Sequence, residues 1–401
     1  FDDGLGSFEK IVSETAIAAC GLAGVVDQTL GNTLGQQGME MFTSDQAFGK
    51  TGKYSFNSYM HGRQYYYGLS AGAAYKFCDN FSAFLGVRGV YALTNYYGYV
   101  ENINVGNMPL YKVLDPTKEN AANIELSCDQ TGVGFTPIIG VDYKTGRWNF
   151  SAKYEFKTRI RLKNKSVNQT PSIGNLPANL ANQMTGILTA KYQQAGLPLE
   201  QAKQQAENTT NTVLSDPKVG ATMMGLKTQF DQKLNKAIGE YEDGKKIAGD
   251  IPGYLALGIG YSPVDAVRVN VGFHWFDDKN ATSYNNRNKE LKRGTLEYNA
   301  GVEVDVNKKI TLSTGWQNTN YGLSDEYMDD KSFVVGSNSA AIGGVYHINK
   351  KMDLNVAYFH TFYQHKKTSE TVQLAADKSN VYNSDYTRNN NVFAVGLDIN
   401  F

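Results

Sequence analysis

Histidine is the side chain best suited to acid–base chemistry near neutral pH, and the chain contains five histidines. His360 shares the alternating apolar register of Leu354, Val356 and Tyr358, and serine and asparagine residues lie nearby in the sequence. A lipid hydrolase acting at a membrane surface is therefore one alternative. No stretch resembles a nucleophile elbow, and the geometry that defines a catalytic triad is not encoded in residue spacing. We expect no catalytic residues and keep lipid hydrolysis only as an alternative function.

Four basic residues, Lys153, Lys157, Arg159 and Arg161, recur at even spacings and so would share one side of an extended segment. Inside a barrel they could steer or clamp a carboxylate. They could also form a solvated row in the lumen, paired with acidic residues, which are Glu155, Glu297, Glu303 and Asp305. The chain carries 39 basic and 39 acidic side chains, and this balance favours mutual compensation of the charged rows.

The sequence predicts neither a metal site nor a cofactor site. The three cysteines, Cys20, Cys78 and Cys128, form no CxxC pair, have no histidine at metal-ligand spacing and are too few for a disulfide framework. We interpret them as unpaired small apolar residues. The glycine-rich stretches precede no helix, so they are not phosphate loops. Because the formal net charge is zero, the chain also lacks the basic surplus that a nucleic-acid-binding protein needs.

Strict alternation of apolar and polar residues dominates the chain and indicates the elements that must position these side chains. In the segment 148–162, Trp148 and Phe150 alternate with Asn149 and Ser151, and the pattern continues through most of the segment. A strand of this length exceeds the five or six residues typical of soluble sheets. It suffices to cross a hydrocarbon layer, which takes about 9 to 11 tilted residues, whereas no window reaches the roughly 20 apolar residues of a membrane helix.

Eleven segments follow this pattern, and their connections alternate between short turns and long loops. The segments are roughly 54–77, 80–104, 123–144, 147–163, 252–262, 264–278, 294–306, 309–322, 334–348, 351–366 and 390–401. Membrane barrels have such unequal connections, and closure satisfies their backbone groups. Tyrosine-rich stretches near strand ends would supply interfacial girdles. We predict an all-β, transmembrane antiparallel β-barrel, with a soluble barrel or propeller as the alternative.

The number of strands indicates that the chain lacks a leading part of the barrel. Bacterial single-chain barrels have an even number of strands, and no secretory signal is visible in the sequence. We expect residues 1–53 to form an extracellular loop with a helical segment, and residues 54–401 to form the barrel. Within the barrel, residues 164–251 are expected to form a helical extracellular insertion.

Two segments and the last residue resemble the FadL family of outer-membrane transporters for long-chain fatty acids and other hydrophobic compounds, in the version found in Bacteroidetes. They are IPGYLALGIGYSPVDAVRVNVGFHWFDDKNA at 251–281, YGLSAGAAYKFCDNFSAFLGVRGVY at 67–91, and Phe401. The resemblance implies a 14-stranded barrel with an N-terminal plug, of which three strands and the plug would be missing here. It also implies a place in the outer membrane of a Gram-negative bacterium, passive uptake without a cofactor, and release through a gap in the wall.

The resemblance further implies that helices of the external loops form a hydrophobic groove for the ligand. In 164–251, apolar residues recur at spacings of three and four, as on one face of a helix. Methionine side chains would adapt such a groove to varied apolar shapes. Helix-on-helix packing within a cap over the barrel explains the same residues equally well. The expected groove residues are Leu176, Leu180, Met184, Ile187, Leu188, Met223, Met224, Leu226, Phe230 and Leu234.

The end of the chain, NVFAVGLDINF, resembles the signal that the barrel-assembly machinery reads, with Phe401 as its aromatic last residue. A regular edge strand is a suitable template for strand addition. The other expected partners are hydrophobic small molecules and outer-membrane lipids. A third functional interpretation makes the barrel an accessory subunit of a larger outer-membrane secretion or assembly complex, with 164–251 as its docking surface.

Overall fold

The computed structural model describes residues 11, 22, 24–31, 54–105, 108–171, 175–328, 333–375 and 378–399. Within these residues, eleven antiparallel strands follow one another along a single sheet, each paired with the next strand of this path. They are β1 (Tyr54–Cys78), β2 (Phe81–Val105), β4 (Ile124–Thr145), β5 (Trp148–Glu155), β8 (Tyr254–Val264), β9 (Val267–Phe276), β10 (Thr295–Asn307), β11 (Ile310–Asn320), β12 (Ser337–Asn349), β13 (Met352–Tyr363) and β16 (Asn389–Ile399). Each of the eleven predicted segments overlaps one of these strands, and the ends differ by a few residues.

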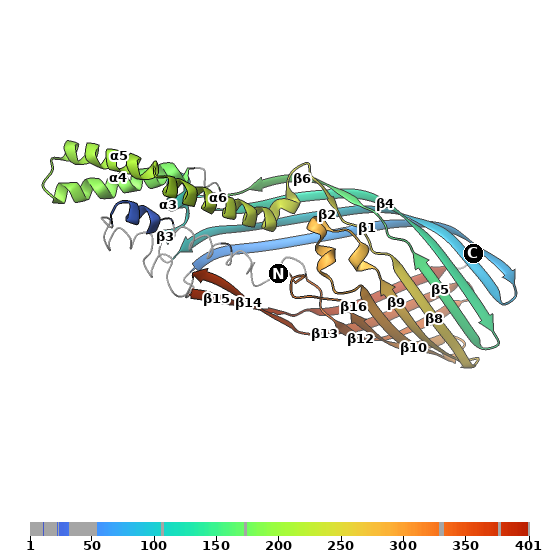
Figure 1. Cartoon of the computed structure of the whole chain (residues 1–401). Helices are drawn as coiled ribbons and strands as arrows, with labels where there is room; N and C mark the ends of the chain where they lie inside the picture. The colour runs from blue at the N-terminus through green and yellow to red at the C-terminus, as the bar shows by residue number, and fades with distance from the viewer. Residues whose placement is uncertain are drawn as a thin grey trace.

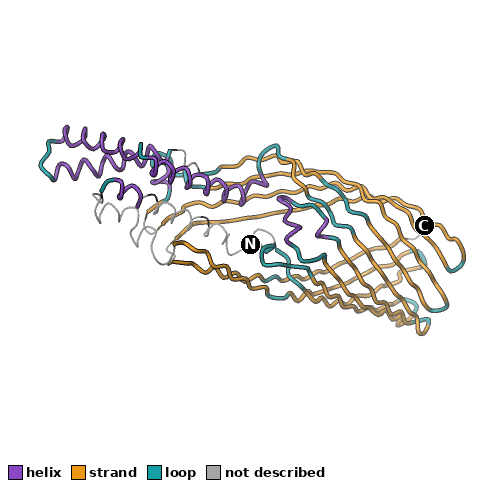
Figure 2. The backbone as a smooth tube through the Cα atoms, in the orientation of Figure 1, coloured by secondary structure: helices purple, strands orange, loops and turns teal. Residues whose placement is uncertain are grey.

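The sheet curls into a deep trough, with the front wall formed by β5, β8 and β9 and the rear wall by β13 and β16 (Figures 1 and 2). Among the described residues, β1 and β16 are the two edges of the sheet and do not pair with one another. The described part therefore does not form the closed cylinder that the sequence predicts, and a total of 14 barrel strands is not confirmed.

The alternation along each strand sorts the side chains between the inner, concave face and the outer face. On β4, Val133, Phe135, Ile139 and Val141 lie outside and are exposed, while Thr136 lies inside and is buried. The outward apolar stretch of β4 runs from residue 133 to residue 143, close to the ~9 to 11 residues that cross a hydrocarbon layer. The apolar face points outward and the polar face inward, opposite to a soluble barrel.

The strands β1, β2 and β4 continue beyond this band. In that part of the sheet the outer face is polar and the inner face is apolar. On the outer face of β4, Val133 is followed towards the start of the strand by Thr131, Asp129 and Ser127, which are polar and exposed. On the inner face, Leu126 is buried together with its neighbours at 124 and 128. The exchange marks the level at which the outward apolar band ends.

The expected strand 147–163 is interrupted between Glu155 and Arg161, and the sheet register changes across the interruption. Lys153 lies opposite Gly140, whereas Lys163, ten residues later, lies opposite Thr131, which is nine residues earlier. One extra residue is therefore accommodated in the interruption, as in a β-bulge. Because side chains alternate with a period of two, this shift moves all later residues to the opposite face. The second part of the strand is β6 (Arg161–Gln169), and β7 (Lys246–Ala248) pairs with it.

A β-hairpin occupies most of the segment 367–389, which connects the last two predicted strand segments. Its strands are β14 (Lys366–Ala375) and β15 (Lys378–Tyr386), paired only with one another. Its residues are rich in threonine, valine and tyrosine, which favour strands, but polar residues occupy both faces, so the pattern lacked an apolar side. The remaining short elements are β3 (Met108–Pro109), α3 (Tyr111–Leu114), η1 (Gly239–Tyr241), η2 (Asp278–Asn280) and η3 (Tyr284–Glu290).

Three helices form most of the insertion: α4 (Leu176–Gln194), α5 (Leu199–Leu214) and α6 (Pro217–Ile238). The start of α6 has clear local causes, because proline suits the first helical position and the Asp216 side chain accepts a hydrogen bond from the Lys218 backbone amide at 2.7 Å. Between α4 and α5 the chain turns at Gly196, whose φ is +94°. None of the described helices is long and apolar enough to span a membrane.

Candidate functional site

The helices α4 and α5 form a hairpin that projects well beyond the sheet, and the first half of α6 joins it (Figure 1). A short helical stretch at 24–29 completes the bundle. We call the shared interior the bundle core. It is built from apolar residues of all four segments, and its buried members are Leu22, Val26, Leu180, Met184, Leu188, Ala206, Val213, Val219 and Leu226.

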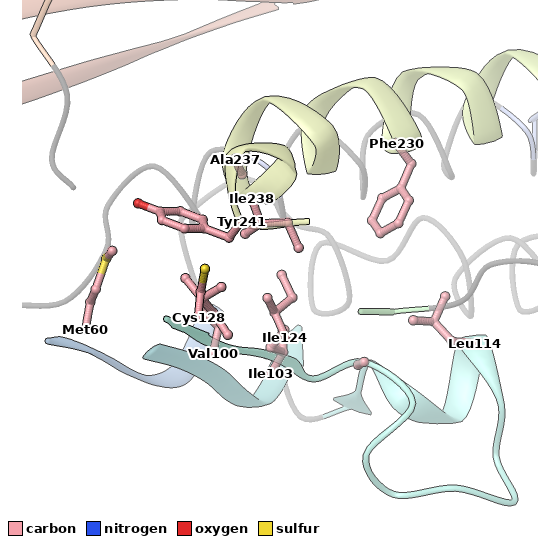
Figure 3. Close-up of a cluster of buried hydrophobic side chains, with 12 residues drawn as sticks. Met60, Val100, Ile103, Leu114, Ile124, Cys128, Phe230, Ala237, Ile238 and Tyr241 are labelled. Carbon is pink, nitrogen blue, oxygen red and sulfur yellow. The ribbon is translucent and has the colours of Figure 1, made fainter. Parts of the chain in front are cut away.

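The second half of α6 lies on the inner face of the sheet, beyond the outward apolar band. Figure 3 shows Phe230, Ile238 and Tyr241 facing Val100, Ile124 and Cys128 across this contact. We call it the sheet cluster; its buried members are Met60, Val100, Ile103, Leu114, Ala122, Ile124, Leu126, Cys128, Phe230, Ala237, Ile238 and Tyr241. Polar contacts fix the end of the helix, since the Asn164 side-chain amide donates to the backbone carbonyls of Glu240 and Glu242 at 2.7 and 2.9 Å.

The ten expected groove residues are divided between these two clusters. Seven of them belong to the bundle core or pack against it: Leu176, Leu180, Met184, Ile187, Leu188, Met223 and Leu226. Phe230 belongs to the sheet cluster, Leu234 packs against it, and Leu176 touches both clusters. Met224 stands apart, with 72% of its surface exposed. Nine of the ten therefore contact one of two apolar clusters, which Leu176 connects.

Below the sheet cluster, the inner face becomes a polar trough with a hollow of about 560 Å³. Its lining comes from β1, β2, β4, β5, β8, β9 and β10 and includes Asp142, Asn149, Lys153, Asn270, His274 and Asn299. Further along the inner face, Arg268 donates to Asp305 at 2.7 Å and to Glu303 at 3.0 Å. Charged side chains in the trough thus largely compensate one another.

Lys153 belongs to a charged group around the buried Glu155 at the upper end of the trough. Glu155 accepts hydrogen bonds from Lys153, at 3.0 Å, and from Arg88. The Lys153 ammonium also lies 5.1 Å from the centre of the Tyr254 ring. Glu155 thus pairs with both cations but carries only one negative charge, and a ligand carboxylate would have to share these cations with it.

The interruption between β5 and β6 is held by Asp250, whose side chain is fully buried. Its carboxylate accepts from the Arg161 guanidinium at 2.8 Å and from the Ile160 backbone amide at 3.1 Å, and it lies 3.8 Å from the Lys157 ammonium. Arg159 is exposed. The four basic residues expected to form one row in the lumen therefore do not do so, because Arg161 follows the register shift and lies on the opposite face from Lys153.

The interrupted segment folds inward against two glycines of β4. A Cβ atom on Gly134 would lie 2.6 Å from Thr158 Cγ2, and one on Gly132 would lie 2.8 Å from Ile160 Cγ2. Ile160 is completely buried in a third apolar cluster with Val90, Ala92, Leu162 and Ile247. The two glycines are thus needed for the close approach of this segment, and alternation alone gave no sign of them.

The other residues singled out in the sequence have simple environments or lie outside the described part. His360 is on the outer face, and its Nδ1 atom is 2.7 Å from the Asn391 side-chain oxygen rather than beside a serine hydroxyl. Cys78 is exposed and Cys128 is buried, and both are free thiols. Phe401, Cys20 and most of the expected loop 1–53 lie outside the described residues.

No family model matches the sequence, and no curated protein matches it. Among solved structures, the chain resembles a FadL homologue from Pseudomonas aeruginosa, at 15% identity and a TM-score of 0.52, over 84% of this chain and 68% of that chain. The toluene transporters TbuX of Ralstonia pickettii and TodX of Pseudomonas putida match at 12% and 13% identity, with TM-scores of 0.39 and 0.41. These matches cover 87% and 85% of this chain and 79% and 70% of those proteins. The first similarity shows a shared fold.

Proposed function

We propose that this chain is the barrel of a FadL-type transporter, in the Bacteroidetes version, that takes up long-chain fatty acids or other hydrophobic small molecules across the outer membrane of a Gram-negative bacterium. The observation that carries the proposal is the sorting of side chains along the strands: large apolar residues are exposed on the outer face, and polar residues line the trough. In water this arrangement is unfavourable, whereas a hydrocarbon layer around the strands makes it favourable.

The proposed ligand site is the apolar interior formed by the bundle core and the sheet cluster. Each buried methylene group of a ligand contributes about 0.8 kcal/mol, so an acyl chain needs no catalytic group or cofactor to be retained. Met184 and Met223 give this interior side chains that repack easily around different apolar shapes. Because the bundle core is filled by its own side chains, we expect ligand entry to require separation of α6 from α4 and α5.

The proposed exit is the interruption between β5 and β6. The trough below the sheet cluster is lined by ion pairs and amides together with small and apolar residues, and an acyl chain passing through it would lose part of its apolar contacts. The interruption lies at the level of Gly132 and Gly134, beside the third apolar cluster and at the end of the outward apolar band. A hydrophobic ligand that leaves there passes beside the third apolar cluster into the hydrocarbon layer, and uptake is passive.

An accessory role in a larger outer-membrane complex is the second candidate, because the α4–α5 hairpin projects well beyond the sheet (Figure 1). A projecting pair of helices is a plausible docking element for another protein. We also propose Phe401 as part of the signal for the barrel-assembly machinery, on the sequence alone. No enzymatic activity is proposed.

The deciding experiment is mass spectrometry of lipids extracted from the protein after purification in mild detergent, combined with uptake of a labelled long-chain fatty acid by cells that produce it. Transport predicts a co-purified hydrophobic molecule and faster uptake than in cells with an empty vector. Absence of both results would reject transport. A protein recovered in a stoichiometric complex, with no bound hydrophobic molecule, would instead support the accessory role.

A further inference from the structure

Lys163 of β6 and Lys246 of β7 lie directly opposite one another in an antiparallel pair. Both side chains are exposed, and within the described part of the chain neither one forms a hydrogen bond or ion pair with a protein group. Residues in such positions have Cβ atoms about 4.5–5.5 Å apart, and like charges there are destabilising. The protein therefore holds two uncompensated positive charges side by side.

The register shift places these lysines outside the barrel. Lys163 is opposite Thr131 and Lys165 is opposite Asp129, both on the outer face of β4, while the alternate residues Leu162 and Asn164 are buried on the inner side. Without the extra residue in the interruption, the two lysines of β6 would point into the lumen.

The level of the lysines on the wall is also defined. On the outer face of β4, Val133 is the last residue of the exposed apolar band. The next outward residue towards the start of the strand is the polar Thr131, which pairs with Lys163. The ammonium groups are thus at the rim where acyl chains end and lipid headgroups begin. Arg161, one step closer to the band, is held by Asp250, and the Asp129 carboxylate accepts from the Asn95 amide at 2.7 Å.

We propose that Lys163 and Lys246, with Lys165 beside them, bind the phosphate group of an anionic lipid in the outer leaflet of the membrane. A phosphate offers several acceptor oxygens to neighbouring ammonium groups and removes the repulsion between the opposed lysines. The net charge of the chain is zero, so this is a local site and not part of a chain-wide positive field. The inference rests on the membrane-barrel part of the proposed function and is independent of the transported molecule.

The test compares binding of two lipids to the full chain in nanodiscs of phosphatidylcholine: diphosphorylated lipid A and the same lipid with its phosphates removed. We expect the wild type to prefer the phosphorylated lipid, and the Lys163→Gln/Lys246→Gln variant to lose about tenfold or more of this preference. The matched control is Lys191→Gln/Lys203→Gln, which removes the same charge from exposed positions of α4 and α5. It should keep the preference of the wild type.

Several outcomes would overturn the inference. Equal binding of both lipids by the wild type, or an unchanged preference in the Lys163→Gln/Lys246→Gln variant, excludes a phosphate site at these lysines. Competition by inorganic phosphate as strong as that by the phosphorylated lipid would contradict a lipid site. If the wild type enters nanodiscs and binds a fatty acid but shows no lipid preference, only this inference fails. If it does not enter nanodiscs at all, the barrel proposal fails with it.

Discussion

Leu226 and Phe230 lie one helical turn apart on α6, yet they belong to two different apolar clusters. Leu226 is buried in the bundle core among residues of α4 and α5, whereas Phe230 is buried against the sheet. The helix α6 therefore connects the projecting bundle to the sheet wall. A rearrangement of the bundle around a ligand would be transmitted along this helix to the inner face of β1, β2 and β4.

Replacing Leu226 and Phe230 separately should destabilise different parts of the protein. Leu226→Ala removes a buried side chain from the bundle core and should cost about 2–5 kcal/mol of local stability there. Phe230→Ala should loosen the second half of α6 on the sheet by about 3–5 kcal/mol. Hydrogen exchange would show the difference: faster exchange in α4 and α5 for the first variant, and in α6 and η1 for the second. An identical exchange profile for both variants would show that the two clusters are one unit.

Two adjacent methionines test whether the bundle core binds the ligand. Met223 packs against the core, whereas Met224 is 72% exposed, so Met223→Ala and Met224→Ala remove the same atoms from different environments. We expect Met223→Ala to weaken binding of a fluorescent fatty acid several-fold, and Met224→Ala to leave it within about twofold. Equal losses in both variants would place the ligand outside the core.

The glycine beside the interrupted strand should be needed for the proposed exit. In Gly134→Ala the new methyl group would lie 2.6 Å from Thr158 Cγ2 and 2.9 Å from the Arg159 carbonyl oxygen, so the segment 156–160 must move, at a cost of about 1–3 kcal/mol. We expect slower fatty-acid uptake at an unchanged amount of protein in the membrane.

Gly140→Ala is the control for this variant, because its methyl group would meet its nearest neighbour at 3.5 Å, an ordinary contact. It should transport at the rate of the wild type. Normal uptake by Gly134→Ala, with hydrogen exchange confirming a displaced segment 156–160, would argue against exit at the interruption.

The β14–β15 hairpin should be anchored in a pH-dependent way by the pair Asp325 and Lys366, which are 2.6 Å apart. The hydrogen bond from Lys366 holds the pKa of the Asp325 carboxyl below its usual range. The stabilisation is therefore complete above the ordinary carboxyl pKa and is lost as the pH falls through the lowered value. The protection factors of the β14 amides, which correct for the slower intrinsic exchange in acid, should fall with acidification in the wild type. In Asp325→Asn the protection of β14 should be low both above the ordinary carboxyl pKa and below the lowered one. A change on acidification that persists in this variant would assign the effect to another group.

The sequence was sufficient for those parts of the fold in which one local pattern extends over a whole element. The alternation of β8 to β13 predicted strands with an apolar outer face, because each residue's face follows from its position in a period of two. The spacing of Leu180, Met184 and Leu188 likewise predicted a helix with one apolar side. The same spacing did not distinguish a ligand groove from helix-on-helix packing, because both bury the same stripe.

The charged residues of β5 and β6 show what the sequence did not determine. Periodicity placed Lys153 and Arg161 on one face, and the structure places them on opposite faces, because the interruption absorbs one extra residue against β4. Residues far away in the sequence make room for it. Gly132 and Gly134 allow the inward segment to approach β4 closely, and Asp250, about ninety positions further along the chain, accepts a hydrogen bond from the Ile160 amide. Local sequence determines that side chains alternate between the two faces of a strand. Contacts between distant strands determine which residues lie on which face, and so which lysines lie on the outer face and which on the inner face.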